Sequence, residues 1–287
     1  MAGAKPVGNR SPTPLQSNPP QGSKAMSYSL NRCNLPPWIV ASREFNEAPE
    51  PISIQGVHAS NQFLFRGLDE IASQAQRAEF FNDYMSVKFH LHQWEEQRST
   101  QARRAIKNSY RRFIRGWGAD SNSVEGAVLK GWVESRIGIP PIYHRERLPT
   151  VRYDDYTPYA LDRMKGSART NDINGQLDLL YAYTQYELGR TWGNHRWLRL
   201  FRGTYDADEH DVVERVSRRE YFVRLNNLCS FTTDKERAWE FGNTVWSVSV
   251  PLCKVFFYGD LLPQSILKGE NEHLVIGGEF RVKEVLY

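Results

Sequence analysis

The pattern of apolar and polar positions has a helical period in the first half of the chain, from about residue 63 onward. Apolar side chains recur there at every third or fourth position, as on one face of an amphipathic helix. Ser123 can cap one of these helices, and Gly138 can end it before a Pro-Pro pair. Residues 139–170, rich in prolines, charges and tyrosines, predict a long irregular connection. The expected helices cover residues 75–94, 101–118, 123–138 and 171–190.

The second half of the chain alternates with the two-residue period of β-strands. Residues 234–242 are the exception and predict a short helix that begins at Asp234. Near the C-terminus, two apolar runs are separated by Gly277-Gly278, a pattern that predicts a β-hairpin. The other expected strands cover residues 196–204, 220–233, 244–251 and 254–259. Helices first and strands last indicate an α+β fold.

The domain organisation follows from a change of composition near the N-terminus. Residues 1–26 are rich in Pro, Gly, Ser, Asn and Gln, show no apolar periodicity, and predict a disordered tail. Residues 27–287 are long enough for a single domain with a substantial core. Within it we expect a mostly helical part at 27–195 and a β-rich part at 196–287.

Composition and charge exclude several classes of protein. The chain of 287 residues is 40% hydrophobic and 24% charged, which is typical of a soluble globular protein. No apolar run is long enough to span a membrane, and the N-terminus does not resemble a signal peptide. Cys33, Cys229 and Cys253 are too few and too scattered for a disulfide framework or a zinc site, so a reducing cytoplasm is expected. The net charge of +4 permits an acidic partner without requiring nucleic acid.

A cluster of basic residues is the most prominent charge feature of the helical half. Its members are Arg98, Arg103, Arg104, Lys107, Arg111, Arg112 and Arg115. Such a segment can contact nucleic acid or an acidic protein surface. Glu95 and Glu96 just upstream dilute the patch, and a solvated helix face is the favoured interpretation.

Motifs for metal and cofactor chemistry of the common kinds are missing from the sequence. His90 and His92 are two residues apart and would not share a helix face, so no metal is expected. The chain has no dinucleotide-binding glycine motif after a strand, no phosphate-binding P-loop, and no nucleophile elbow.

Three short features of the β-rich part carry the candidate chemistry. Arg202 follows an apolar strand and precedes Gly203, so its planar guanidinium can bind an anion where a ligand approaches the backbone. Ser230-Phe231-Thr232 places two hydroxyls on one strand face. Glu270-Asn271-Glu272 would place two like charges side by side on one strand face, which is unfavourable unless a ligand uses them. Each signal is weak alone.

Their order along the chain resembles the Arg-Ser-Glu class of NAD-dependent mono-ADP-ribosyltransferases, in which Glu-x-Glu accompanies an arginine acceptor. Longer segments are more specific, namely "NRCNLPPWIVASREFN", "NSYRRFIRGWGADSNSVEGAVLKGWVESRIG", "RLNNLCSFTTDKERAWEFG" and "LLPQSILKGENEHLVIGGEF". From about Arg32 to the C-terminus the chain is similar to the dinitrogenase reductase ADP-ribosyltransferase family.

The resemblance implies a mono-ADP-ribosyltransferase-like fold with a C-terminal split β-sandwich that holds the NAD site. It implies transfer of ADP-ribose from NAD, the co-substrate, to an arginine of the nitrogenase iron protein, which switches nitrogen fixation off. A PII-type signalling protein is the regulator that the family implies, and the bacterial cytoplasm is the implied location. Neither nucleic acid nor a membrane is an expected partner.

The resemblance also implies roles for individual residues. Glu272 would stabilise the oxocarbenium-like ribose, Glu270 would hold and deprotonate the acceptor guanidinium, and Ser230 would orient Glu272 by a hydrogen bond. The implied NAD-binding residues are Arg202, Gly203, Ser230, Phe231, Thr232 and Phe241. Arg202 would hold the phosphates or the adjoining ribose, Gly203 would pair with the nicotinamide amide, and Phe241, or less favourably Trp239, would stack on nicotinamide.

Two rival interpretations stay open at this point. The first is an arginine-specific mono-ADP-ribosyltransferase with another protein target, such as a toxin. The second is a non-enzymatic module that binds nucleic acid through its basic helix and carries a β-rich partner domain.

Overall fold

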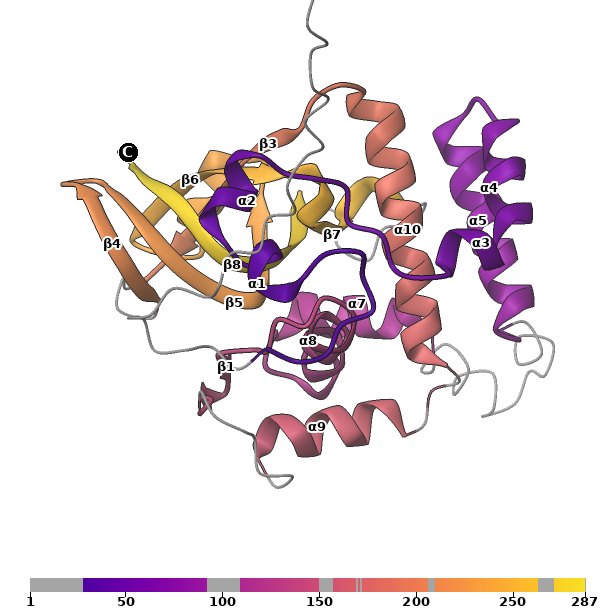
Figure 1. Cartoon of the computed structure of the whole chain (residues 1–287), viewed down its shortest axis with the longest axis horizontal. Coiled ribbons are helices and arrows are strands. Elements are labelled where there is room, and N and C mark those ends of the chain that lie inside the picture. Colours follow the sequence, from indigo (N-terminus) through magenta and orange to yellow (C-terminus); the bar gives the residue numbers. More distant parts are fainter. Residues whose placement is uncertain are drawn as a thin grey trace, which may run out of the picture.

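A computed structural model of the chain describes residues 28–91, 109–149, 157–168, 170, 172–205, 210–262 and 271–286. The expected disordered tail at 1–26 and residues 98–107 of the basic cluster lie outside the described residues. Helices come first along the described chain and strands dominate after residue 196, so the α+β class is confirmed. Figure 1 shows the strands of residues 197–285 gathered on one side of the molecule, with the helices of residues 57–88 and 173–192 on the other and those of residues 110–167 below.

The structure has helices that overlap each of the four segments predicted from apolar periodicity, and further helices within residues 37–60 and 158–167 that were not predicted. The described helices are α1 Pro37–Val40, α2 Arg43–Glu47, α3 Val57–Ser60, α4 Gln62–Asp69, α5 Gln74–Lys88, α7 Tyr110–Ala119, α8 Val124–Arg136, α9 Pro158–Ser167, α10 Ile173–Trp192 and α11 Lys235–Trp239. The predicted caps hold: the Ser123 side chain accepts a hydrogen bond from the Gly126 N–H, and Asp234 accepts from two N–H groups of α11.

The expected irregular connection at 139–170 is wrong in part. It contains the two-stranded ribbon of β1 Tyr143–His144 and β2 Glu146–Arg147, and then the ten-residue α9. Thr157 caps α9 through its hydroxyl, and Pro158 stands at the first turn, where a proline costs no hydrogen bond. The helix packs tightly on α8, since a Cβ on Gly166 would overlap the Val128 side chain. The prolines and charges of this segment mark a helix start and an exposed face.

All strand pairings are antiparallel, and the main sheet has the order β4-β5-β3-β6-β8-β7 with an additional pairing of β5 with β8. Its strands are β3 Trp197–Thr204, β4 Asp211–Ser217, β5 Glu220–Thr232, β6 Thr244–Pro251, β7 Val255–Tyr258 and β8 Glu272–Val285. Short 3-10 turns at Leu252–Lys254 and Gly259–Leu261 flank β7. Because β5 and β8 pair with each other and also with β3 and β6, the sheet curls back on itself.

The predicted hairpin at Gly277-Gly278 is wrong, because both glycines lie inside the single strand β8. The register with β5 shifts there: Leu225 pairs with Gly278 and Leu228 with Ile276, so two residues of β5 face one of β8. A Cβ on Gly277 would overlap the Asn226 carbonyl oxygen, and Gly278 has a φ of 120° against the backbone of Ala41. The glycine pair therefore marks a β-bulge with close backbone approach.

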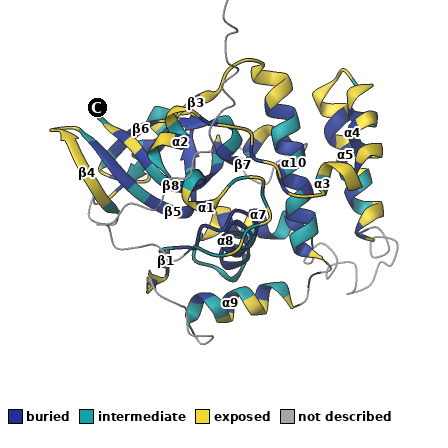
Figure 2. Ribbon diagram, viewed as in Figure 1, coloured by how far each residue is buried: buried dark blue, intermediate teal, exposed yellow. Residues whose placement is uncertain are grey.

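Two large hydrophobic cores and a small third cluster of Ala127, Leu148 and Tyr159 result from this arrangement. The curled sheet encloses one core, which includes Trp246 and Phe280, each at most 1% exposed. The helices share a second core with the other face of the sheet, where Trp132 of α8 packs on Phe256 of β7 with ring centroids 4.8 Å apart. Figure 2 shows α8 buried along most of its length and β4 exposed. Helices α8 and α10 both contact the strands.

A lysine is buried beside the bulge. The Lys254 ammonium donates to the Gly277 carbonyl at 3.2 Å and lies 4.6 Å from the centroid of the Phe280 ring. Burial lowers the pKa of Lys254 to about 7. The Gly277 carbonyl at the bulge therefore gives the buried Lys254 ammonium a hydrogen-bond acceptor.

We expect Gly277→Ala to lower the free energy of unfolding by about 3 kcal/mol, because the added methyl group forces the β5–β8 ladder apart. Gly189→Ala is the matched control, since a Cβ there meets nothing within 4 Å and the residue lies exposed in α10. That control should raise stability by about 0.5–1 kcal/mol through helix propensity. Denaturant unfolding of both variants is the measurement. Equal stability of Gly277→Ala and the wild type would contradict the bulge assignment.

Candidate active site

One cavity of about 330 Å³ brings the sequence-predicted residues together at the end of the curled sheet. Ligand pockets span roughly 300–1,000 Å³, so this volume suits a small ligand or part of a larger one. The predicted residues that line it are Arg202, Gly203, Ser230, Phe231, Thr232, Phe241 and Glu272. They come from β3, β5, β8 and the segment after α11, which are far apart in sequence.

Ser230 and Glu272 are placed by the register of β5 with β8. Thr232 pairs with Glu272 and Ser230 with Leu274, so Ser230 and Glu272 are diagonal neighbours on one face of the ladder. The Ser230 hydroxyl donates to the Glu272 carboxylate Oε1. Glu272 is 7% exposed, so the carboxylate is largely shielded from water. A buried carboxylate fixed by a hydroxyl is a preorganised negative charge aimed at the cavity.

Arg202 lies at the end of β3, where the strand reaches the cavity. Its Nη1 donates to the Ser230 carbonyl at 2.8 Å, and its guanidinium carbon lies 6.0 Å from the Phe231 ring centroid. Within the described part of the chain, its buried Nε has no hydrogen-bond partner. A guanidinium that is held in place and keeps an unused donor fits an anionic ligand group such as a phosphate.

Helix α11 closes one wall of the cavity through its packing on β3. The Thr232 hydroxyl accepts from the Asp234 N–H at 3.1 Å, which ties the end of β5 to the start of α11. A Cβ on Gly203 would overlap the Ala238 carbonyl oxygen, so this glycine permits the close packing of α11. Phe241 follows the helix, lines the cavity and is 49% exposed. Trp239 is not among the lining residues, so the geometry favours Phe241 as a stacking surface.

The helical part supplies a wall that the sequence did not predict. Its lining residues are Trp117, Gly118, Ala119, Asp120 and Ser121, at the corner between α7 and α8. Trp117 contacts the predicted site directly, because its indole N–H donates to the Ser230 hydroxyl at 2.8 Å. Tyr205, after β3, also lines the cavity and is 66% exposed. No short motif marks these residues, since they reach the site through the packing of a helix on a strand about a hundred residues later.

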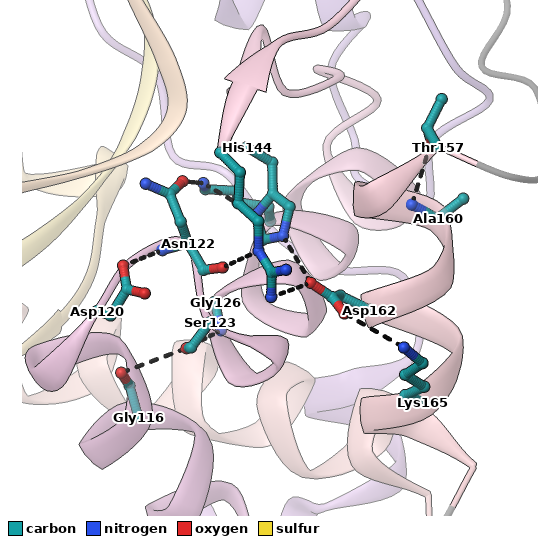
Figure 3. Close-up of polar contacts among 12 residues, drawn as sticks. Gly116, Asp120, Asn122, Ser123, Gly126, His144, Thr157, Ala160, Asp162 and Lys165 are labelled. Atoms are coloured by element: carbon teal, nitrogen blue, oxygen red, sulfur yellow. Dashed lines mark hydrogen bonds and ion pairs between the residues drawn. The ribbon is translucent and has the colours of Figure 1, made fainter.

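The corner is held by its own network of hydrogen bonds, which Figure 3 shows. The Asn122 N–H donates to Asp120 Oδ1 at 2.8 Å, and the Ser123 hydroxyl donates to the Gly116 carbonyl at 3.4 Å. Arg145 Nε donates to the Asn122 carbonyl at 3.1 Å, and Arg145 also pairs with Asp162 of α9. The corner is therefore clamped between α7, α9 and the β1–β2 ribbon.

Two basic groups near the site have lowered pKa values. Burial, followed by the positive charge of Arg202, lowers the pKa of His210 to about 3, so this imidazole is neutral at neutral pH. Burial also lowers the pKa of Lys130 to about 8. His210 lies against Trp246 with ring centroids 5.2 Å apart and is not a lining residue of the cavity.

The second predicted glutamate, Glu270, lies outside the described residues. The expectation that the Glu270–Glu272 segment is an extended strand is wrong at Asn271, which has a φ of 45° in the left-handed region. Strand β8 begins only at Glu272. The two-residue alternation that was expected to place Glu270 on the face of Glu272 therefore does not extend across Asn271.

Among the described residues no group of three or more His, Cys, Asp or Glu side chains is placed to hold a metal ion. Nor is any helix in the described ranges long and apolar enough to cross a membrane. Of the basic cluster, Arg111, Arg112 and Arg115 are described, and Arg112 forms an ion pair with Glu125 of α8 at 2.7 Å.

Comparison with known proteins adds the identity of the family. The model of the dinitrogenase reductase ADP-ribosyltransferase family matches residues 30–284. The chain belongs to this family. It is 40% identical over 262 residues to the NAD(+)–dinitrogen-reductase ADP-D-ribosyltransferase of Rhodospirillum rubrum, covering 90% of this chain and 95% of that relative. No solved structure matches the chain.

Membership of the dinitrogenase reductase ADP-ribosyltransferase family confirms the resemblance seen in the sequence. The match begins within a few residues of Arg32 and runs through β8, so it includes the α7–α8 corner as well as the sheet. The cavity therefore lies wholly within the matched region, and both the helical and the β-rich part of the chain contribute to it.

Proposed function

We propose that this protein transfers ADP-ribose from NAD to an arginine of dinitrogenase reductase, the nitrogenase iron protein. The observation that carries the proposal is the convergence of Arg202, Ser230 and Glu272 in one cavity of a chain that belongs to this family. The relative of known function is named for the same donor and the same acceptor protein.

The cavity residues fit NAD on chemical grounds. The Arg202 guanidinium, which lines the cavity, suits a phosphate oxygen, and the exposed Phe241 ring suits a flat nicotinamide. The shielded Glu272 carboxylate suits a sugar that becomes positively charged as its glycosidic bond breaks. Arg202, Glu272 and Phe241 line the same cavity. One site therefore offers partners for the phosphate, the ribose and the nicotinamide of NAD.

The transfer breaks the bond between the ribose C1′ and the nicotinamide nitrogen, and the bonding electron pair leaves with nicotinamide, which becomes neutral. A guanidinium nitrogen of the acceptor forms the new bond to C1′ and releases one proton. Glu272 lowers the barrier because its charge interacts more strongly with the oxocarbenium-like transition state than with the ground state. Glu270 is the proposed base, since a guanidinium with a pKa above about 12 needs a carboxylate partner to lose its proton.

The consequence for the target follows from the size and charge of the added group. ADP-ribose carries two phosphate charges, and on the docking surface of the iron protein it would block contact with the electron acceptor. Nitrogen fixation then stops. Regulation by a PII-type protein and a bacterial cytoplasmic location belong to this proposal as expectations from the family.

The test is incubation of the full chain with labelled NAD and dinitrogenase reductase. We expect label on the iron protein, and Glu272→Gln should lower kcat by about 10²–10³-fold while NAD still binds. Glu236→Gln is the matched control, because that exposed carboxylate of α11 is outside the cavity. Label on some other protein but never on the iron protein would identify another target. Full activity of Glu272→Gln would overturn the site assignment.

The same assay separates the roles of the two glutamates. Glu270→Gln should lose transfer to arginine and keep hydrolysis of NAD, whereas equal loss of both reactions would show that Glu270 is not acceptor-specific. Salt-sensitive binding to duplex DNA without any NAD turnover would instead favour the nucleic-acid-binding module.

Arg202→Lys should weaken NAD binding by roughly 10- to 100-fold, because a lysine keeps the charge and loses the forked donors. Arg199→Lys is the matched control, since Arg199 is on the same strand, exposed, and absent from the cavity wall. Isothermal titration with NAD measures both. If the two variants bind NAD equally well, Arg202 does not contact the dinucleotide.

A further inference from the structure

Helix α7 contacts strand β5 through the Trp117 side chain. Its buried stripe consists of Tyr110, Phe113, Ile114 and Trp117, which recur at helical spacing. All four belong to the core that the helices share with the sheet, and Tyr110 donates through its hydroxyl to Asn82 of α5 at 2.8 Å. Trp117, which is 3% exposed, also donates its indole N–H to Ser230 on β5 at 2.8 Å. Of this stripe, Trp117 is thus the member that touches the proposed catalytic machinery.

In the hydrogen bond between Trp117 and Ser230, the indole is the donor and the hydroxyl is the acceptor. An indole N–H can only donate, whereas a serine hydroxyl has one donor hydrogen and two acceptor lone pairs. Trp117 therefore occupies an acceptor position of Ser230, and the hydroxyl hydrogen is directed to Glu272 Oε1. Donor and acceptor polarise each other along such a chain, most strongly where water is excluded. Without the indole, the Ser230 hydroxyl loses a donor that helps to hold its hydrogen toward Glu272.

The indole itself is held on its other side. The Lys130 ammonium of α8 lies 5.9 Å from the Trp117 ring centroid, and Lys130 is 1% exposed. The ammonium is fixed by donation to Asn122 Oδ1 at 3.1 Å and to the Tyr143 carbonyl at 3.0 Å. A cation near the ring draws electron density from the indole and strengthens its N–H as a donor. Lys130 thus anchors the indole to the α7–α8 corner.

We propose that Trp117 is a positioning residue that orients Ser230 toward Glu272 and so links the helical part to the chemical step. The inference rests on the proposed function for its kinetic consequence, but the hydrogen bond itself is independent of it. Loss of one such bond should reduce kcat by roughly 3- to 10-fold and leave the KM for NAD within about twofold. Substitution of a residue that contributed only to core packing would lower stability without this selective fall in kcat at nearly constant KM.

The kinetic test is a double-mutant cycle of Trp117→Phe and Ser230→Ala, with ADP-ribose transfer as the readout. We expect Trp117→Phe to lower kcat in the wild-type background and to have no further effect in Ser230→Ala. Trp132→Phe is the control, because it removes a buried indole N–H bonded to Asp178 at 2.7 Å, away from the cavity. Equal effects of Trp117→Phe in both backgrounds, or an equal kcat loss in Trp132→Phe, would overturn the proposal.

A second readout needs no catalysis and remains valid if Trp117→Phe does not fold. In the nuclear magnetic resonance spectrum of the full chain, the Trp117 indole N–H signal should move upfield in Ser230→Ala, because its acceptor is removed, while the Trp132 signal should stay. An unmoved Trp117 signal would show that the bond is absent and overturn the inference. A moved signal in a chain that transfers no ADP-ribose would support the contact and refute the proposed function instead.

Discussion

The pairing of β5 with β8 is the interaction on which the rest of the structure depends. It runs from Glu220–Lys283 to Thr232–Glu272 and brings the two ends of the β-rich part together. Because side chains alternate along strands, a slip by one residue would turn Glu272 away from Ser230 and out of the cavity. The bulge at Asn226-Asn227 opposite Gly277 fixes this register, since only that alignment lets the two backbones approach so closely. The bulge lies about four residues of strand, or roughly 13 Å, from Ser230. The register that it fixes therefore determines how Ser230 and Glu272 face each other.

The same bulge attaches the helices to the sheet. Asn227 donates through its amide to the carbonyls of Lys130 and Ile139, each at 2.9 Å, and is fully buried. Lys130 in turn extends its ammonium toward the Trp117 ring, and Trp117 donates to Ser230. A closed path of contacts thus runs from the bulge through α8 and α7 back to β5. The helical part thus lines the candidate site together with the strands.

Periodicity and capping residues correctly predicted the elements that depend on neighbouring residues in the sequence. Helices α8 and α10, the cap of α11 and most strands follow from periodicity and capping residues. The sequence pattern singled out Arg202, Ser230 and Glu272, and the structure places all three at one cavity.

The features that the sequence did not predict correctly depend mostly on contacts between distant segments of the chain. Gly277-Gly278 has the sequence of a turn, and only the approach of Asn226 and Ala41 makes it part of a strand. Strand β4 was not predicted, since it is an exposed edge without an alternating buried face. Trp117 has the spacing of a core residue, and its role depends on where β5 lies relative to α7.

The most direct measurement is a crystal structure of the protein with a non-hydrolysable NAD analogue. We expect the pyrophosphate to lie against the Arg202 guanidinium and the nicotinamide ribose beside Glu272, with the Trp117–Ser230–Glu272 hydrogen bonds intact. An analogue bound elsewhere, or bound in this cavity with its ribose turned away from Glu272, would contradict the central claim that the β5–β8 register builds the catalytic site.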